Sequence, residues 1–248
     1  MSPVVFHSPP VGHGSEKSAD AGFFLGVIIL RKSAFFIDGF NLYHSLDNTR
    51  LYHKYKWLNL WKLSELLLLS NEELQDVYYF SAYTDWNDSR KLRHQNYVLL
   101  NKNCGCKVIL GKFMKKDRTS MVECNTPCKT EVQRYCRKKY IAHEEKMTDV
   151  NIAVNIVKAA ALKTYEAIYL LSGDNDLIPS LKTALEISPD IKIRVVLPIN
   201  AKAKSLMSFC SDHSLRYIRI KESLLSSSQF PDPVFIKDLR YDKPEHWN

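Results

Sequence analysis

Glycine is scarce in this sequence, with only eight residues in 248. No G-x-G-x-x-G fingerprint occurs, which argues against a dinucleotide cradle built on such a loop. Long apolar runs are also missing: the strongest candidate, residues 23–30, is far shorter than the roughly 18 to 20 residues of a membrane span. Lys17 is the only Lys or Arg before that run, whereas an export signal begins with basic residues. We therefore expect a cytoplasmic protein without a membrane segment.

The composition is that of a globular domain, since 45% of the residues are hydrophobic and 25% are charged. The length suits one α/β domain with elaborations or two small domains. Residues 1–31 are rich in Pro, Gly, Ser and His, and we interpret them as a flexible leader. Residues 32–225 would form the domain, and residues 226–248 a polar tail. The net charge of +8 favours polyanionic partners, nucleic acid first among them.

Apolar runs typical of buried strands alternate with segments of helical periodicity along most of the domain. Such alternation predicts an α/β fold with a central, mostly parallel sheet covered on both faces. The expected strands are 34–37, 77–83, 107–113, 167–171, 191–197 and 215–220, and the expected helices are 57–69, 88–101, 149–163, 176–187 and 202–210. We expect Thr148 to cap the helix at 149–163, which is apolar on most of its circumference and should be well buried.

Four aspartates are expected at one edge of this sheet. Asp38 ends the first strand, Asp174 and Asp176 follow the strand at 167–171, and Asp149 begins the helix before that strand. Ligands of parallel sheets bind at the carboxyl ends of the strands. Crowded carboxylates repel one another unless a divalent cation lies between them, and oxygen ligands point to Mg²⁺ or Mn²⁺. Such a site suits phosphodiester hydrolysis.

Each aspartate also has an ordinary explanation. Asp38 precedes Gly39 and suits a turn, Asp149 suits the positive end of a helix, and Asp174 and Asp176 suit a turn and a helix cap. The functional interpretation rests on all four being predicted at the same edge.

Three segments resemble the motifs of NYN domains, a branch of the PIN-like nuclease superfamily, and the chain looks nearest to the bacterial LabA-like group. They are Phe36–Leu42 (FIDGFNL), Glu145–Asn151 (EKMTDVN) and Leu171–Leu177 (LSGDNDL), in the order of the family. The resemblance implies a PIN-like three-layer sandwich that binds Mg²⁺ or Mn²⁺ through the four aspartates and cleaves RNA. It also implies catalytic support from Asn41, which would orient a ligand, water or phosphate, and substrate contacts from Ser172 and Lys146. Lys146 equally suits a solvated surface position.

Residues 114–143 lack clear periodicity, and we interpret them as an insertion. Between residues 107 and 146, eleven Lys or Arg face five Asp or Glu, so 11 − 5 = +6 of the chain's +8 lies there. Cations interleaved with aromatic residues suit single-stranded RNA, although a solvated loop would look similar. The basic residues that we expect to bind substrate are Lys115, Lys116, Arg118, Arg137, Lys138 and Lys139.

Five of the six cysteines also lie in or near this insertion. Cys124, Cys128, Cys136 and His143 could hold a structural Zn²⁺, with Cys104 and Cys106 as replacements for His143. The set lacks the tight C-x₂-C pair of most zinc sites, and free thiols are the alternative. Cys210 is expected to be packed in a helix face.

Three hypotheses follow. The first is a Mg²⁺- or Mn²⁺-dependent ribonuclease acting on RNA, preferably single-stranded. The second is a catalytically silent RNA-binding or regulatory module, and the third is a monooxygenase that oxidises a hydroxypyridine, as the resemblance to the LabA-like group also implies. The sequence leaves a homo-oligomer open.

Overall fold

Six parallel strands form the central sheet of the protein, whose computed structural model describes residues 30–123 and 135–247. Their order in the sheet is β3-β2-β1-β6-β7-β8, and each neighbouring pair is parallel, as predicted. The strands are β1 (Arg31–Asp38), β2 (Glu72–Ser81), β3 (Lys107–Leu110), β6 (Ala167–Leu171), β7 (Lys192–Leu197) and β8 (Arg216–Arg219). The strand order reverses between β1 and β6, and this is where ligands bind in open α/β sheets.

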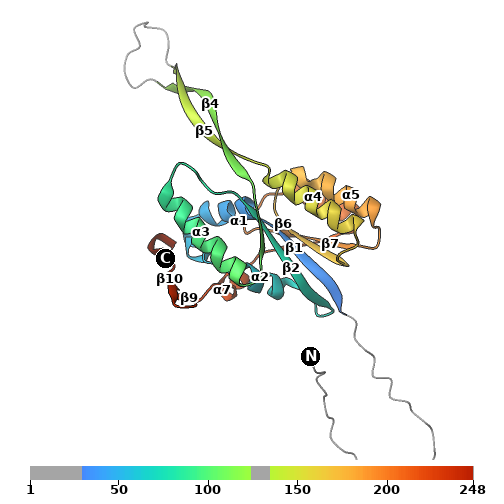
Figure 1. Ribbon diagram of the computed structural model, residues 1–248. Helices are drawn as coiled ribbons and strands as arrows, with labels where there is room; N and C mark the ends of the chain where they lie inside the picture. The colour runs from blue at the N-terminus through green and yellow to red at the C-terminus, as the bar shows by residue number, and fades with distance from the viewer. Residues whose placement is uncertain (1–29, 124–134, 248) are drawn as a thin grey trace, which may run out of the picture.

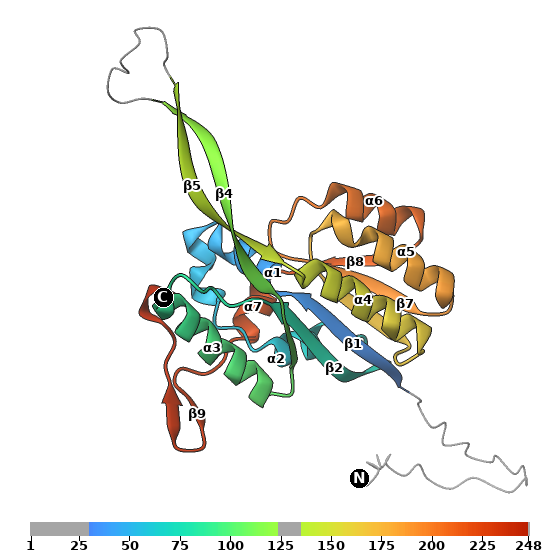
Figure 2. The same ribbon diagram turned by 45° about the horizontal axis from the view of Figure 1, so that its top comes forward.

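Helices cover both faces of the sheet and complete a three-layer sandwich (Figures 1 and 2). One layer contains α4 (Thr148–Ala161), α5 (Ile178–Ile187) and α6 (Lys204–Asp212), and the other contains α1 (Gly39–Asp47), α2 (Leu60–Leu67), α3 (Asp88–Asn103) and α7 (Glu222–Ser227). Short 3₁₀ turns lie at Arg50–Tyr55, Asn175–Leu177 and Glu245–Trp247. Alternation along β1 supplies both cores: Ala34 and Phe36 face the α4 side, whereas Phe35 and Ile37 face the α1 side.

Two expectations about α4 are wrong. Thr148 is its first residue, and Met147 precedes it in a left-handed conformation (φ 82°) without a side-chain cap. The backbone N–H of Thr148 donates instead to Glu145 (2.9 Å). Val150 and Val154 are 65% and 58% exposed, so only the side of α4 that carries Ile152 and Ile156 is buried. The high content of Ala, Val and Ile therefore led us to expect that more of the helix surface would be buried than is the case.

The insertion is a two-stranded antiparallel ribbon, not an irregular segment. β4 (Lys112–Glu123) pairs with β5 (Tyr135–Lys146) along twelve residue pairs, from Lys112–Lys146 to Glu123–Tyr135. The ribbon leaves the body of the protein and projects from it (Figure 1). Both faces of the ribbon are mostly polar, so its sequence lacks the alternation of apolar and polar residues that marks a half-buried strand. At its base, a Cβ on Gly111 would lie 2.6 Å from the carbonyl oxygen of Lys146, so only glycine permits this close approach.

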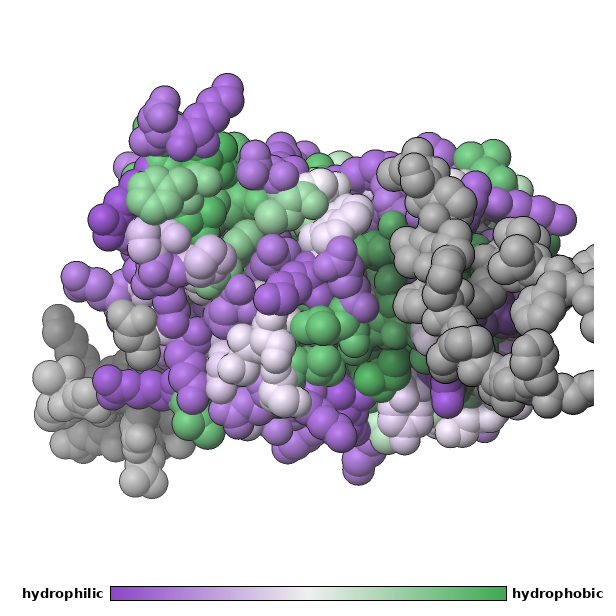
Figure 3. Space-filling model, turned by 90° about the horizontal axis from the view of Figure 1, so that it is seen from below, coloured by the Kyte–Doolittle hydropathy of each residue, from purple (hydrophilic) through white to green (hydrophobic). Residues whose placement is uncertain are grey.

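The segment after residue 225 packs onto the domain. Phe230 and Trp247 join the core beside Trp57, whose indole N–H donates to the carbonyl of Pro231 (3.1 Å). A short hairpin of β9 (Val234–Ile236) and β10 (Leu239–Tyr241) lies between them. Among the described residues, every helix is too short or too polar to cross a membrane. Hydrophilic residues cover most of the visible surface opposite the ribbon, with apolar ones in separate patches (Figure 3).

Candidate functional site

Asp38 ends β1 and is the most buried carboxylate at the C-terminal edge of the sheet, with 2% of the residue exposed. One oxygen accepts from the backbone N–H of Asn41 (2.9 Å) and the other from the hydroxyl of Ser172 (2.8 Å). Burial raises the pKa of Asp38, and nearby Asp174 adds to this, while the hydrogen bonds oppose it. A Cβ on Gly39 would lie 2.6 Å from the carbonyl of Phe80, so glycine lets α1 begin directly after Asp38.

The loop after β6 brings residues of the third motif to Asp38. The hydroxyl of Ser172 accepts from the N–H of Asp174 (3.0 Å), and a carboxylate oxygen of Asp174 accepts from the N–H of Asp176 (2.9 Å). The side-chain oxygen of Asn41 accepts from the N–H of Gly173 (2.9 Å) and so joins α1 to this loop. These bonds fix the backbone that carries the carboxylates.

Ser172 therefore differs from its expected role as a substrate contact. The residue is fully buried, and its hydroxyl is used by Asp38 and Asp174. Asn41 lines the cleft, but its oxygen is also used within the protein. Both residues position the acidic loop.

Asp149 lies in the first turn of α4 and faces the same edge. Desolvation raises its pKa to about 6, and the negative charges of Asp38, Asp174, Glu145 and Asp176 add to the effect in that order. Glu145 was missed by the sequence analysis, although it lies within the second motif. Its signal was a carboxylate placed three residues before a helix start, where it can accept from the first free N–H groups.

These carboxylates are close enough to raise the pKa of Asp149, but their side chains do not point at one common position. In residues 30–123 and 135–247, no three His, Cys, Asp or Glu side chains are arranged as a ready metal site. None of the five carboxylates forms an ion pair with a described Lys, Arg or His. The donor set is nevertheless of the type that Mg²⁺ and Mn²⁺ prefer, and a cation would offset the repulsion that raises the pKa of Asp149.

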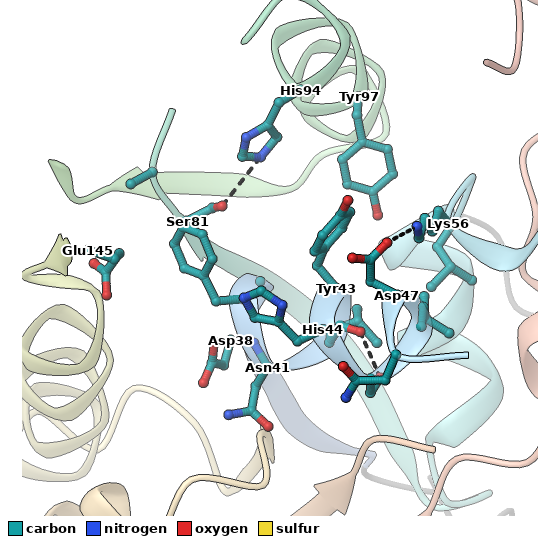
Figure 4. Close-up of a pocket in the computed structure, with 18 of the residues that line it drawn as sticks. Asp38, Asn41, Tyr43, His44, Asp47, Lys56, Ser81, His94, Tyr97 and Glu145 are labelled. Atoms are coloured by element: carbon teal, nitrogen blue, oxygen red, sulfur yellow. Dashed lines mark hydrogen bonds and ion pairs between the residues drawn. The ribbon is translucent and has the colours of Figure 1, made fainter. Parts of the chain in front are cut away.

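The edge of the sheet that carries these carboxylates opens into a cleft of about 1100 Å³. Asp38, Glu145, Asp149 and Asp174 line it, whereas Asp176 is exposed outside its wall. Figure 4 shows Asp38, Asn41 and Glu145 on one side of the cleft and Asp47 and Lys56 on the other. The wall also contains residues of α1, α3, the ribbon base and the C-terminal turn.

An aromatic junction links the ribbon base to this cleft. The ring of Phe113 meets Trp86 edge to face at 4.7 Å between centroids and Phe40 at 5.6 Å. The His143 ring lies 3.7 Å from that of Trp86. These contacts fix the direction in which the ribbon leaves the domain.

The predicted basic residues follow the ribbon rather than the cleft. Lys116, Arg118 and Lys146 all form ion pairs with Glu144, so part of their charge is offset. Lys146 pairs opposite Lys112, on the ribbon face away from Glu145 and Phe113, and does not line the cleft. Strand alternation places Lys115, Arg137 and Lys139 on one ribbon face and Lys116, Arg118 and Lys138 on the other.

The predicted zinc site is not supported as a single four-ligand set. Cys124 and Cys128 lie outside the described residues. Cys136 and His143 are both in β5, seven residues apart, which in an extended strand is about 23 Å. Ligands of one zinc ion lie within a few ångströms of each other, so this strand excludes His143 as a partner of Cys136. Cys106 and Cys210 are buried in the cores, as was expected for Cys210.

Basic residues that sequence reasoning missed lie in the cleft wall. Arg90 and Arg93 come from α3, Lys56 from the turn before α2, and Lys202 from the loop before α6. The spacing of Arg90, Arg93, His94 and Tyr97 places them on one helix face, which is a signal that the sequence contained. Nothing in the sequence pattern indicated that this face would line the same cleft as α1.

The fold and the acidic loop agree with a comparison against known families. The sequence profile of the NYN domain matches residues 32–216. The chain belongs to the NYN domain family. NYN domains are part of the PIN-like nuclease superfamily, so the chain has a nuclease-type fold of a class that typically uses divalent metal ions and binds RNA.

Other comparisons add little to this assignment of an NYN domain. A protein of unknown function from Vibrio parahaemolyticus has a similar structure, with 14% sequence identity and a TM-score of 0.48. The match covers 78% of this chain and 95% of that one. No curated protein matches the sequence.

Proposed function

We propose that this NYN protein is a Mg²⁺- or Mn²⁺-dependent ribonuclease that hydrolyses RNA phosphodiester bonds at the acidic side of the cleft. The observation that carries the proposal is the group of five carboxylates formed by Asp149 and the four acidic residues around it, none of which has a cationic partner among the described residues. Folding such a group is unfavourable by itself, and a divalent cation removes the penalty. The family motifs favour the LabA-like branch.

Asp38, Asp149 and Asp174 are the residues that would hold the metal, with Glu145 beside them. A bound divalent ion lowers the pKa of a water ligand and stabilises negative charge on a phosphate. The chain contributes orientation: Ser172 and the N–H of Asn41 fix the Asp38 carboxylate, and Asn41 fixes the loop that carries Asp174. Asp176 is exposed and acts on the group through its charge.

The ribbon would guide the RNA towards this side of the cleft. Arg137, Lys138 and Lys139 are exposed on it, and cations of this kind bind phosphates by counterion release. The ribbon face that carries Lys115, Arg137 and Lys139 also carries Phe113 and Glu145, and this face continues into the cleft wall.

A cleavage assay tests the proposal. Labelled single-stranded RNA is incubated with the protein and Mn²⁺ or Mg²⁺, beside a sample with EDTA. Cleavage that requires metal supports the ribonuclease. Intact RNA that binds in a salt-sensitive manner favours the silent RNA-binding module instead. If RNA neither binds nor breaks, the cleft acts on a smaller molecule, and consumption of a reduced nicotinamide with a hydroxypyridine would identify the oxidising alternative.

A further inference from the structure

The cleft has a second charged region, formed by α3 and lying outside the three family motifs. Arg90 and Arg93 line the cleft from the first turns of this helix. Neither forms an ion pair with any residue of the described ranges. Arg90 is exposed and Arg93 is half-buried, so both guanidinium groups are accessible to a ligand in the cleft.

The charges of these arginines act on the side of the cleft away from the acidic group. They act on the hydroxyl of Tyr43: burial and Asp47 raise its pKa, whereas Arg90 and Arg93 oppose the rise. Tyr43 and Asp47 lie with Lys56 on the side of the cleft away from Asp38 and Glu145 (Figure 4). The two arginines therefore belong to this second side.

The second side already contains one internal ion pair. Lys56 has a side chain that is 4% exposed, pairs with Asp47 and lies 5.0 Å from the centre of the Tyr43 ring. Asp47 is thus used by Lys56, and Arg90 and Arg93 have no comparable carboxylate among the described residues. Two accessible guanidinium groups in a cleft wall attract an anion, and a guanidinium matches a phosphate with two parallel N–H donors.

We propose that Arg90 and Arg93 form a phosphate-binding subsite that holds a single-stranded RNA across the cleft, one or more nucleotides from the carboxylates. Trp86 precedes the same helix; His143 and Phe113 contact its ring, but the residue is 40% exposed, so an unpaired base next to the bound phosphate can contact the open part of the ring. This inference rests on the proposed function in its choice of RNA, and it adds a fixed contact that positions the scissile phosphate.

The test compares two matched double variants of the full chain. Arg90→Gln/Arg93→Gln removes two charges from the cleft face of α3. Lys91→Gln/Lys102→Gln removes the same charge from another face of α3, since neither lysine lines the cleft. Binding of a short, labelled single-stranded oligoribonucleotide is measured by fluorescence anisotropy at several salt concentrations, with all proteins carrying Asp174→Asn to prevent cleavage.

We expect the arginine pair to raise Kd by about ten- to hundredfold and the lysine pair by less than about threefold. The slope of log K against log salt should fall by about 1.4 for the arginine pair, because each phosphate contact to a single strand contributes about 0.7. Melting temperatures close to that of the parent confirm that both pairs fold.

Equal losses from the two pairs would show unspecific attraction and overturn the subsite, as would RNA that does not bind at all. The experiments distinguish a failure of the subsite from a failure of the proposed function. If binding depends on Arg90 and Arg93 but the parent protein cleaves nothing with metal, the subsite stands and the ribonuclease does not. If cleavage occurs and its KM is unaffected by Arg90→Gln/Arg93→Gln, the ribonuclease stands and the subsite does not.

Discussion

Two buried carboxylates, Glu72 and Asp38, lie at opposite edges of the central sheet. Glu72 begins β2 at the N-terminal edge of the sheet, where the side chains of Arg194 and Tyr169 contact it; Arg194 Nη1 is 2.6 Å from Glu72 Oε1. Asp38 ends β1 at the C-terminal edge, where its charged neighbours are further carboxylates. Both residues are almost inaccessible, at 6% and 2% exposure.

The difference lies in where the compensating charge comes from. At Glu72 the chain supplies its own cation from β7, and the pair is closed. At Asp38 the described chain supplies hydrogen-bond donors but no cation, and the site opens into a cleft. The first arrangement is suited to holding the sheet together, and the second is suited to binding a cation from solution. Removal of a carboxylate charge should therefore lower the stability of the protein at the Glu72 edge and raise it at the Asp38 edge.

Asp174→Asn should have the largest effect, on activity. Loss of one metal-holding carboxylate should reduce cleavage by at least about a thousandfold, because the chemical step depends on charge stabilisation by the bound ion. RNA binding should stay within about threefold, since the basic residues remain. Rates of cleavage with saturating RNA measure the first effect and anisotropy the second.

The matched control is Asp190→Asn, an exposed aspartate in the turn before β7. It changes the net charge equally and should retain full activity. Cleavage by Asp174→Asn at a rate near that of the wild type would place the active site elsewhere.

Glu72→Gln should have its large effect on stability instead. Breaking a buried ion pair leaves Arg194 uncompensated, and we expect the free energy of unfolding to fall by about 3 to 4 kcal/mol. Urea unfolding measures this loss, and kcat per folded molecule should be unchanged. The double variant Glu72→Met/Arg194→Met should recover much of the stability, because it removes both charges. A single variant as stable as the wild type would contradict the role assigned to this pair.

The site shows which features a sequence can predict. The strand ends carrying Asp38 and Asp174 followed from apolar runs, because burial on both faces of a parallel sheet leaves a local signal. Glu145 and Arg90 did not follow, since their positions in the cleft wall depend on how the folded chain arranges the ribbon base and α3 around α1. The positioning role of Ser172 did not follow either, because its hydroxyl donates to Asp38 at the end of the neighbouring strand β1, a contact that only the folded sheet creates.

The ribbon shows the opposite limitation. Its strands project from the body with polar side chains on both faces, so no apolar alternation marks them. Pairing between β4 and β5 holds it, and the sequence signal for such pairing is weak when neither face is buried. The junction of Phe113 with Trp86 joins residues far apart in the chain and depends on the same folded context.

Asp149→Asn should change stability in the opposite direction to the loss expected for Glu72→Gln. Without metal, the variant relieves repulsion by Asp38, Asp174 and Glu145, and we expect a gain of about 1 kcal/mol, reduced by solvent because the residue is exposed. With Mn²⁺ at about tenfold its Kd, the wild type should gain about 1.4 kcal/mol and the variant much less. Thermal melts with and without Mn²⁺ measure both effects. Equal stabilisation of the two proteins by Mn²⁺ would show that the ion binds outside this carboxylate group.

His94 offers a smaller comparison, between a neutral, half-buried side chain and the charged ones. It lines the cleft from α3, its Nε2 is 3.3 Å from the Ser81 hydroxyl, and desolvation lowers its pKa to about 4. An unfolded chain binds a proton near the usual pKa of about 6.5, whereas the folded protein resists it until about 4. Stability from this residue is therefore complete above pH 6.5 and is lost as the pH falls towards 4.

His94→Gln should remove about 1 to 2 kcal/mol of that pH dependence, after allowance for partial exposure. Urea unfolding of both proteins at several pH values between 4 and 7 measures the contribution of His94 to the unfolding free energy, because the other titrating groups are shared. Parallel stability curves for the two proteins would mean that His94 accepts a proton in the folded state as readily as in the unfolded one.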